Sequence, residues 1–142
     1  MKKKAIISAC LLGLDCRYDG KNNYIGEEKL KKLREEYELI PVCPEVYGGL
    51  TTPRVPSERV GDRVLSKTGT DVTAEFHKGA GIALQLAETF GCEAAVLKEN
   101  SPSCGSGTVY DGSFTNTLCP GDGVTAELLK KHGLTVIGES EI

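Results

Sequence analysis

The sequence predicts an α/β fold in which a mostly parallel sheet is flanked by helices, similar to a Rossmann-like, doubly wound fold. Short apolar runs that suit buried strands alternate with segments of helical periodicity, and this alternation favours parallel strands connected through helices. The 142 residues, 26% of them charged, fit one hydrophobic core. We therefore expect a single compact domain over residues 1–142, with small hairpin insertions.

The first part of the chain predicts two strands and a helix. Residues 5–10 form an apolar run that is too short for a helix and suits a buried strand. Residues 29–37 place Leu30, Leu33 and Tyr37 at helical spacing. Residues 38–43 predict the second strand, and Pro41 within it lacks a backbone donor, which favours an edge position or an early exit from the sheet.

The remainder predicts the longest helix and two further strands. Apolar side chains form one stripe over 71–90, which Thr70 or Asp71 is expected to cap and Gly91 to end. A strand at 93–97, a capped helix at 122–132 and a strand at 134–137 complete the alternation. Two hairpins are expected, one over 58–65 turning at Gly61-Asp62 and one over 109–114 turning at Asp111-Gly112.

Charge and hydropathy exclude several classes of protein. The 17 basic and 20 acidic residues give a net charge of −3, and a protein that binds duplex DNA usually has a basic face. No apolar stretch reaches the length of about 20 residues that spans a membrane, and the N-terminal lysines do not lead into a signal peptide. We therefore expect a cytoplasmic protein that binds neither DNA duplexes nor membranes.

The chain has six cysteines but one methionine and no tryptophan. Cytoplasmic thiols stay reduced, so these side chains are buried apolar groups, metal ligands or reactive thiols. Cys10 and Cys43 are expected to end the first two strands, and Cys104 lies in the loop after the third. Because the carboxyl ends of parallel strands share one edge, we expect these three thiols to converge there.

Three converging thiolates without a fourth predict a metal or cluster site with an open coordination position. Thiolates select zinc, cuprous copper or iron–sulfur centres. The spacing differs from that of a zinc ribbon, since there is no Cys-x-x-Cys and both histidines, His77 and His132, lie in helical patterns. The alternative is that each of the three is an ordinary buried cysteine.

Polar residues beside these cysteines offer acid–base and binding chemistry. Glu45 lies two residues beyond Cys43 and suits a general acid or base; without the cysteine beside it, a solvated loop glutamate would be the better interpretation. The loop over 98–107 is rich in serine and glycine, typical of an anion or carbonyl site but also of a plain turn. The candidate side chains are Ser101, Ser103 and Ser106, with Arg54, Arg59 and Arg63 as carboxylate or phosphate ligands.

The other cysteines have less defined predictions. Cys92 is expected to pack in the core at the opposite edge of the sheet, and Cys119 to open a loop before a helix. Cys16 follows Cys10 by six residues, which permits a redox pair. Cys16 also occupies the position where a phosphatase loop needs arginine, and Arg17 comes one residue late.

Several motifs in order resemble the thiouracil desulfidase (TudS-like) family. The resemblance covers essentially the whole chain. It rests on Ser8-Ala-Cys-Leu-Leu-Gly13, Arg17-Tyr-Asp-Gly20, Pro44-Glu45, Tyr47-Gly-Gly-Leu50, Pro53-Arg54, Lys98-Glu-Asn-Ser-Pro-Ser-Cys-Gly105 and Gly121-Asp-Gly-Val-Thr125.

The resemblance implies a four-iron, four-sulfur cluster held by Cys10, Cys43 and Cys104, with one iron open to substrate. It also implies hydrolytic, non-redox removal of sulfur from 2-thiouracil or 4-thiouridine-type compounds, with Glu45 as the acid/base residue and Ser101 as the active-site serine. The expected partner is thus a thiolated pyrimidine base, nucleoside or nucleotide. Two alternatives remain: a non-catalytic iron–sulfur or metal-binding module, and a thiol enzyme of phosphatase or reductase type centred on Cys10.

Overall fold

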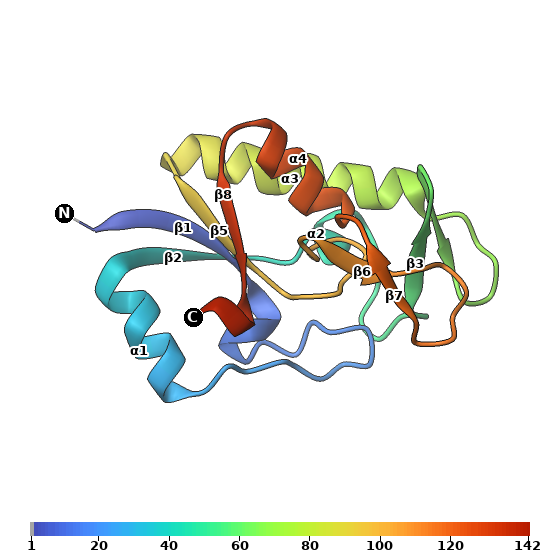
Figure 1. Ribbon diagram of the computed structural model, residues 1–142, viewed down its shortest axis with the longest axis horizontal. Coiled ribbons are helices and arrows are strands. Elements are labelled where there is room, and N and C mark those ends of the chain that lie inside the picture. Colours follow the sequence, from blue (N-terminus) through green and yellow to red (C-terminus); the bar gives the residue numbers. More distant parts are fainter. Residues whose placement is uncertain (1) are drawn as a thin grey trace.

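A four-stranded parallel sheet organises the chain, as the computed structural model of residues 2–142 shows (Figure 1). The strands are β1 (Lys3–Ser8), β2 (Tyr37–Val42), β5 (Ala94–Leu97) and β8 (Thr135–Gly138), in the spatial order β2-β1-β5-β8. All three pairings are parallel, so the predicted α/β class is confirmed. β2 lies at an edge, as Pro41 predicted.

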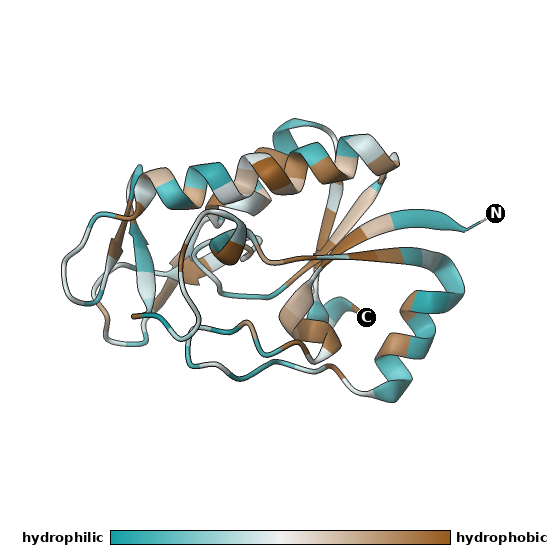
Figure 2. Cartoon of the chain, turned by 180° about the vertical axis from the view of Figure 1, so that it is seen from behind, coloured by the Kyte–Doolittle hydropathy of each residue, from teal (hydrophilic) through white to brown (hydrophobic). Residues whose placement is uncertain are grey.

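Helices cover both faces of this sheet. α3 (Thr73–Phe90) and α4 (Val124–Lys131) lie on one face, and α1 (Glu27–Glu36) lies on the other (Figure 1). One buried cluster joins β1, β5 and the first two of these helices through Ile6, Ala83, Ala95 and Leu129. Another cluster, formed by Ile7, Leu11, Leu33 and Val96, packs α1 on the opposite face. In Figure 2 the inner parts of the sheet strands are apolar, whereas the start of β1 is hydrophilic and the helices alternate between hydrophilic and hydrophobic residues.

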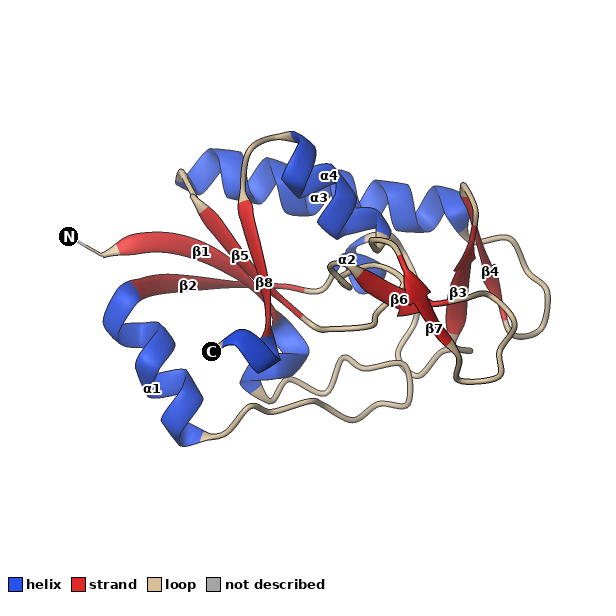
Figure 3. Ribbon diagram, viewed as in Figure 1, coloured by secondary structure: helices blue, strands red, loops and turns tan. Residues whose placement is uncertain are grey.

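Two antiparallel hairpins and a short helix stand beyond the carboxyl edge of the sheet (Figure 3). The hairpins are β3 (Ser57–Val60) with β4 (Arg63–Ser66), and β6 (Thr108–Tyr110) with β7 (Leu118–Pro120). The short helix is α2 (Pro44–Tyr47), and 3-10 turns lie at Ala9–Leu12 (η1) and Glu139–Glu141 (η2). The first hairpin turns at Gly61-Asp62 as predicted.

Three local predictions were wrong. β1 ends at Ser8, before Cys10, because the chain turns into η1 and thereby buries Leu11 completely. The second hairpin does not turn at Asp111-Gly112, because β6 pairs with residues 118–120 across a longer loop. Cys119 consequently lies within β7 instead of opening a loop.

α2 lies between the predicted strand at 38–43 and the predicted hairpin at 58–65, where no helix is expected from the sequence. Its signal was a proline at the first helical position after Cys43, which is a favoured arrangement for a helix start. No helix in residues 2–142 has the length and apolarity needed to cross a membrane.

Candidate active site

A cleft of about 580 Å³ opens between the carboxyl edge of the sheet and the two hairpins. One wall comes from the segments that follow β1, β2 and β5, and the opposite wall comes from the hairpins. Its lining includes the thiols of Cys10, Cys16, Cys43 and Cys104, together with Glu45, Arg54, Glu58, Ser101, Tyr110, Phe114 and Asn116.

The three cysteines predicted to converge all line this cleft. Cys10 lies in η1 just after β1, Cys43 directly follows β2, and Cys104 lies in the loop after β5. Across residues 2–142, no three His, Cys, Asp or Glu side chains gather closely enough to hold a single metal ion. Thiolates that bind different irons of a cluster lie farther apart than the ligands of one ion.

Cys43 is the thiol best prepared to ionise. The Cys43 thiol donates a hydrogen bond to the Cys16 carbonyl oxygen at 3.9 Å, and its contact with the Cys16 side chain lowers the pKa of Cys43 to about 7, although burial acts in the opposite direction. The Val46 backbone N–H and the charge of Arg54 lower this pKa further. The same contact with Cys43 raises the pKa of Cys16.

The other two thiols are kept neutral by burial. Burial raises the pKa of Cys10, which a hydrogen bond from the Asn23 side chain partly offsets. Burial likewise raises the pKa of Cys104 to about 12, and the Ser8 hydroxyl opposes this through its hydrogen bond. A bound metal stabilises the thiolate form, so these two side chains gain most from a cationic partner.

Backbone contacts fix the orientation of the Ser101 hydroxyl. Its oxygen accepts the N–H groups of Ser103 (3.1 Å) and Cys104 (3.0 Å). With both acceptor positions occupied, the hydroxyl proton is available to donate into the cleft.

The N-terminus of α4 holds the loop that carries Ser101 and Cys104. The N–H groups of Val124 and Thr125 donate to the carbonyls of Pro102 and Ser103, and the buried hydroxyls of Ser103 and Thr125 lie 2.7 Å apart. Ser103 is therefore structural, whereas Ser101 faces the cleft.

Arg54 fastens the Glu45 carboxylate. Its Nη2 donates to Glu45 Oε2 and to the Cys16 carbonyl, both at 3.0 Å, and its Nη1 donates to Thr51 and Thr52. The Arg54 side chain is only 6% exposed and that of Glu45 20%. Of the three arginines predicted as carboxylate ligands, Arg54 therefore binds a carboxylate inside the cleft.

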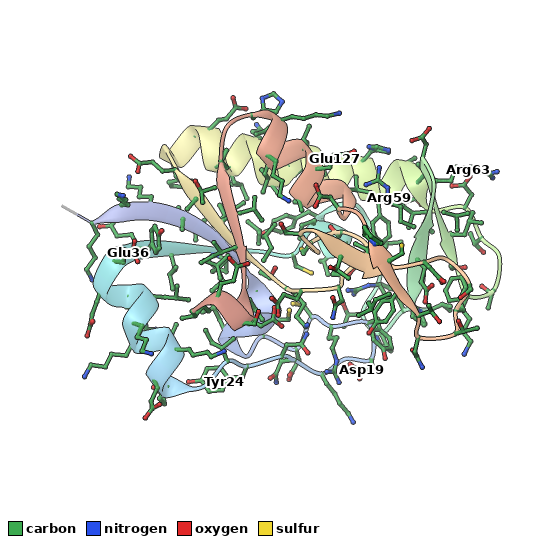
Figure 4. The ribbon with its side chains drawn as sticks, in the orientation of Figure 1. Asp19, Tyr24, Glu36, Arg59, Arg63 and Glu127 are labelled. Carbon is green, nitrogen blue, oxygen red and sulfur yellow. The ribbon has the colours of Figure 1, made fainter. Side chains whose placement is uncertain are left out.

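The remaining two arginines bind carboxylates away from the cleft. Arg59 pairs with Glu127 of α4 at 3.0 Å (Figure 4), and Arg63 pairs with Asp71 just before α3 at 2.9 Å. The first ion pair connects the β3–β4 hairpin to α4, and the second connects it to the segment that leads into α3. The predicted cap of α3 was wrong, because Val72 occupies the N-cap position and no side chain caps the helix from there; the Asp71 carboxylate instead accepts the N–H of Thr73, the first helical residue.

Two glycines bring α2, and with it Cys43 and Glu45, against α3. A Cβ atom at Gly79 would lie 1.8 Å from the Pro44 carbonyl oxygen, and one at Gly48 would lie 1.9 Å from the Glu75 carbonyl oxygen. Only glycine permits this contact between backbones.

The three cysteines that are not proposed ligands, Cys16, Cys92 and Cys119, have different surroundings. Cys92 packs against the core beside β5, as predicted, and Cys119 is half-buried in β7 and does not line the cleft. The sequence did not assign Cys16, whose contact with Cys43 forms when the 13–26 loop crosses the cleft. No local signal in the sequence places its side chain beside Cys43. Arg17, the near match to a phosphatase arginine, instead pairs with Asp19 and Asn23.

Comparison with known proteins decides the family. A sequence model described as 2-thiouracil desulfurase matches residues 5–141. The chain belongs to the 2-thiouracil desulfurase family. The chain is also similar to the protein described as uncharacterized protein YbbK of Bacillus subtilis. The two are 41% identical over 147 aligned residues, which cover 96% of each chain.

A solved structure extends the match to three dimensions. The [4Fe-4S]-dependent thiouracil desulfidase TudS superposes on this desulfurase-family chain with a TM-score of 0.94 at 48% identity, covering 99% of this chain and 93% of the other. The family resemblance predicted from the sequence motifs is thereby confirmed.

Proposed function

We propose that this protein binds a four-iron, four-sulfur cluster through Cys10, Cys43 and Cys104 and uses it to remove sulfur from thiolated pyrimidines by hydrolysis. The substrates are 2-thiouracil and 4-thiouridine-type compounds, acted on in the cytoplasm as bases, nucleosides or nucleotides. The observation that carries the proposal is the meeting of three cysteines from three strand ends in one cleft with Glu45 and Ser101. The family and the cofactor named for the solved relative support it.

The donor set of the cleft fits such a cluster. Thiolates are the usual protein ligands of iron–sulfur clusters, and three of them leave one iron without a protein ligand. When bound, the cluster supplies an iron that accepts a soft thiocarbonyl sulfur in preference to a hard carbonyl oxygen.

Glu45 and Ser101 provide the proton chemistry. Glu45, held by Arg54, accepts a proton from a water molecule whose oxygen attacks the ring carbon that bears sulfur. The Ser101 hydroxyl donates a hydrogen bond that orients the pyrimidine or that water, because its acceptor positions are filled by backbone N–H groups. Glu45 then returns the proton to the departing sulfur.

The overall reaction balances without electron transfer. Water supplies the oxygen of the new C=O bond, the C=S bond breaks, and sulfur leaves with both water protons as hydrogen sulfide. A non-redox hydrolysis therefore needs no external oxidant or reductant.

Anaerobic reconstitution with iron and sulfide tests the function. We expect the loaded protein to release sulfide and uracil from 2-thiouracil. Glu45→Gln keeps the shape of the side chain but loses the base, so turnover should fall by about 10²–10⁴-fold while iron content stays unchanged. Ser101→Ala should also lower turnover and keep the iron.

Glu36 offers a matched control, because it lies at the end of α1, away from the cleft (Figure 4). Glu36→Gln should leave both turnover and iron unchanged. Loaded protein that releases no sulfide would refute the enzymatic function. Cluster binding with turnover indifferent to Glu45→Gln would instead favour a mechanism without this acid/base residue, and activity in air after chelation would favour a thiol enzyme.

A further inference from the structure

Three residues with unusual backbone conformation meet in the cleft. Among residues 2–142, the non-glycine residues with positive φ are Asn100 (66°), Phe114 (58°) and Asn116 (57°), and all three line the cleft. Such conformations are strained for side chains with a Cβ atom and concentrate at functional sites, where the surrounding structure maintains them. Two of the three belong to the loop between β6 and β7, residues 111–117.

A buried carboxylate maintains this loop. Glu58 of β3 is 8% exposed, and its Oε1 accepts the N–H groups of Gly112 (2.9 Å) and Phe114 (3.1 Å). Gly112 packs closely on the same strand, since a Cβ atom there would lie 2.8 Å from Val60 Cγ2. These contacts hold the 111–117 loop against the β3–β4 hairpin.

Hydrogen bonds between hydroxyl and carboxylate side chains within the loop do not involve Phe114 or Asn116. The Ser113 hydroxyl donates to Asp111 and lies 2.6 Å from that of Thr115, which in turn lies 2.8 Å from that of Thr117. Phe114 and Asn116 are not members of this chain of hydroxyls, and both line the cleft.

The wall that faces these two residues carries the proposed reaction chemistry. Cys10, Cys43, Glu45 and Ser101 come from the sheet edge, and Phe114 and Asn116 come from the hairpin side. A pyrimidine is flat, with apolar faces and an edge of alternating N–H and C=O groups. Aromatic side chains stack on such rings, and an amide both donates and accepts hydrogen bonds.

We infer that the 111–117 loop is the base-recognition wall of the site, where Phe114 stacks on the pyrimidine ring and Asn116 hydrogen-bonds to its edge. Glu58 is a positioning residue that holds the loop in its strained conformation. This assignment rests on the proposed function, because it takes a thiolated pyrimidine as the substrate. It adds the determinants of ring recognition, which neither the cysteines nor Glu45 supply.

Steady-state kinetics on the loaded protein and calorimetric binding of uracil test the inference together. Uracil lacks the sulfur, so its affinity reports on ring recognition rather than on sulfur binding. Phe114→Ala should raise KM for 2-thiouracil and weaken uracil binding about tenfold, with kcat changed much less. Phe114→Tyr, which retains an aromatic face, should restore both values.

Asn116→Ala and Glu58→Ala provide independent variants. Asn116→Ala should weaken uracil binding through the lost edge contact, and Glu58→Ala should do so by releasing the loop. Phe90→Ala is the matched control, because Phe90 is an exposed phenylalanine (45%) at the end of α3 and does not line the cleft. It should leave KM, kcat and uracil affinity unchanged.

The outcomes separate this inference from the proposed function. If the wild-type protein releases sulfide, and Phe114→Ala and Asn116→Ala have the same KM and uracil affinity as the wild type, the assignment of the recognition wall is wrong. The proposed desulfurisation is then still supported. If the wild-type protein releases no sulfide, the proposed function is wrong. Loss of uracil binding in Phe114→Ala and Asn116→Ala would still support the recognition wall. Wild-type protein that does not bind uracil would overturn the wall.

Discussion

Arg54 illustrates how one side chain positions Glu45, the proposed acid/base residue. It is nearly buried, and its contacts connect Glu45 with the carbonyl of Cys16 in a loop distant in sequence. Its Nε is buried without a hydrogen-bond partner within residues 2–142. An unsatisfied buried donor costs stability, so the position of Arg54 reflects the demands of the cleft rather than of folding alone.

Substitution of Arg54 should therefore affect turnover more than folding of the sheet. Arg54→Met removes the ion pair and leaves Glu45 free to move away from the attacking water, so we expect kcat to fall by roughly 10–100-fold. Arg54→Lys keeps the charge but loses the two-branched contact, and should recover part of the rate. The measurement is sulfide release at saturating 2-thiouracil, with iron content determined on the same samples.

Arg59→Met serves as the comparison, because Arg59 makes a similar ion pair with Glu127 but does not line the cleft. Its effect should be confined to thermal stability. Equal losses of kcat in Arg54→Met and Arg59→Met would show that Arg54 has no special relation to the site.

At the scale of elements, the contact between α2 and α3 sets the position of Cys43 and Glu45. Gly79→Ala would force a methyl group into the Pro44 carbonyl, and the short helix must then move. We expect the substitution to lower the free energy of unfolding by roughly 1–3 kcal/mol, so that the variant unfolds at a lower temperature. We also expect it to bind less iron after reconstitution.

Gly81 lies in the same helix and gives the opposite prediction. A Cβ atom there meets no atom within 4 Å, so Gly81→Ala should stabilise the protein by about 0.5–1 kcal/mol through helix propensity. Thermal unfolding followed by circular dichroism compares the two variants directly. If Gly79→Ala were as stable as Gly81→Ala and bound full iron, the close backbone contact would not determine the site.

The elements differ in how far the sequence determines them. The strands and long helices follow from local periodicity, and Cys10, Cys43 and Cys104 converge because parallel strands end at one edge. The β6–β7 loop was mispredicted because its conformation depends on Glu58, more than 50 positions earlier in the chain, which binds the N–H groups of Gly112 and Phe114. The residues of the loop alone do not predict a contact with a side chain so far away in the sequence.

The whole molecule uses its sheet to gather residues from three distant segments into one site. Each proposed cluster ligand follows a different strand, so the cluster would connect β1, β2 and β5 at their carboxyl ends. A ligand that binds only the folded chain stabilises that chain against unfolding. The loaded protein should therefore have a higher Tm than the same protein after the iron is removed anaerobically with a chelator.

Serine substitutions test whether all three segments contribute to this stabilisation. Cys10→Ser, Cys43→Ser and Cys104→Ser should each lower the iron retained after reconstitution and reduce the Tm difference between loaded and chelated protein, because serine is a poor ligand for a soft iron–sulfur centre. Cys92→Ser is the matched control, since Cys92 packs beside the opposite end of β5 and should retain full iron. Iron quantification and thermal melts under nitrogen provide the measurements. Full iron binding by any one of the three variants would remove that cysteine from the ligand set, whereas iron loss in Cys92→Ser would trace the effect to folding.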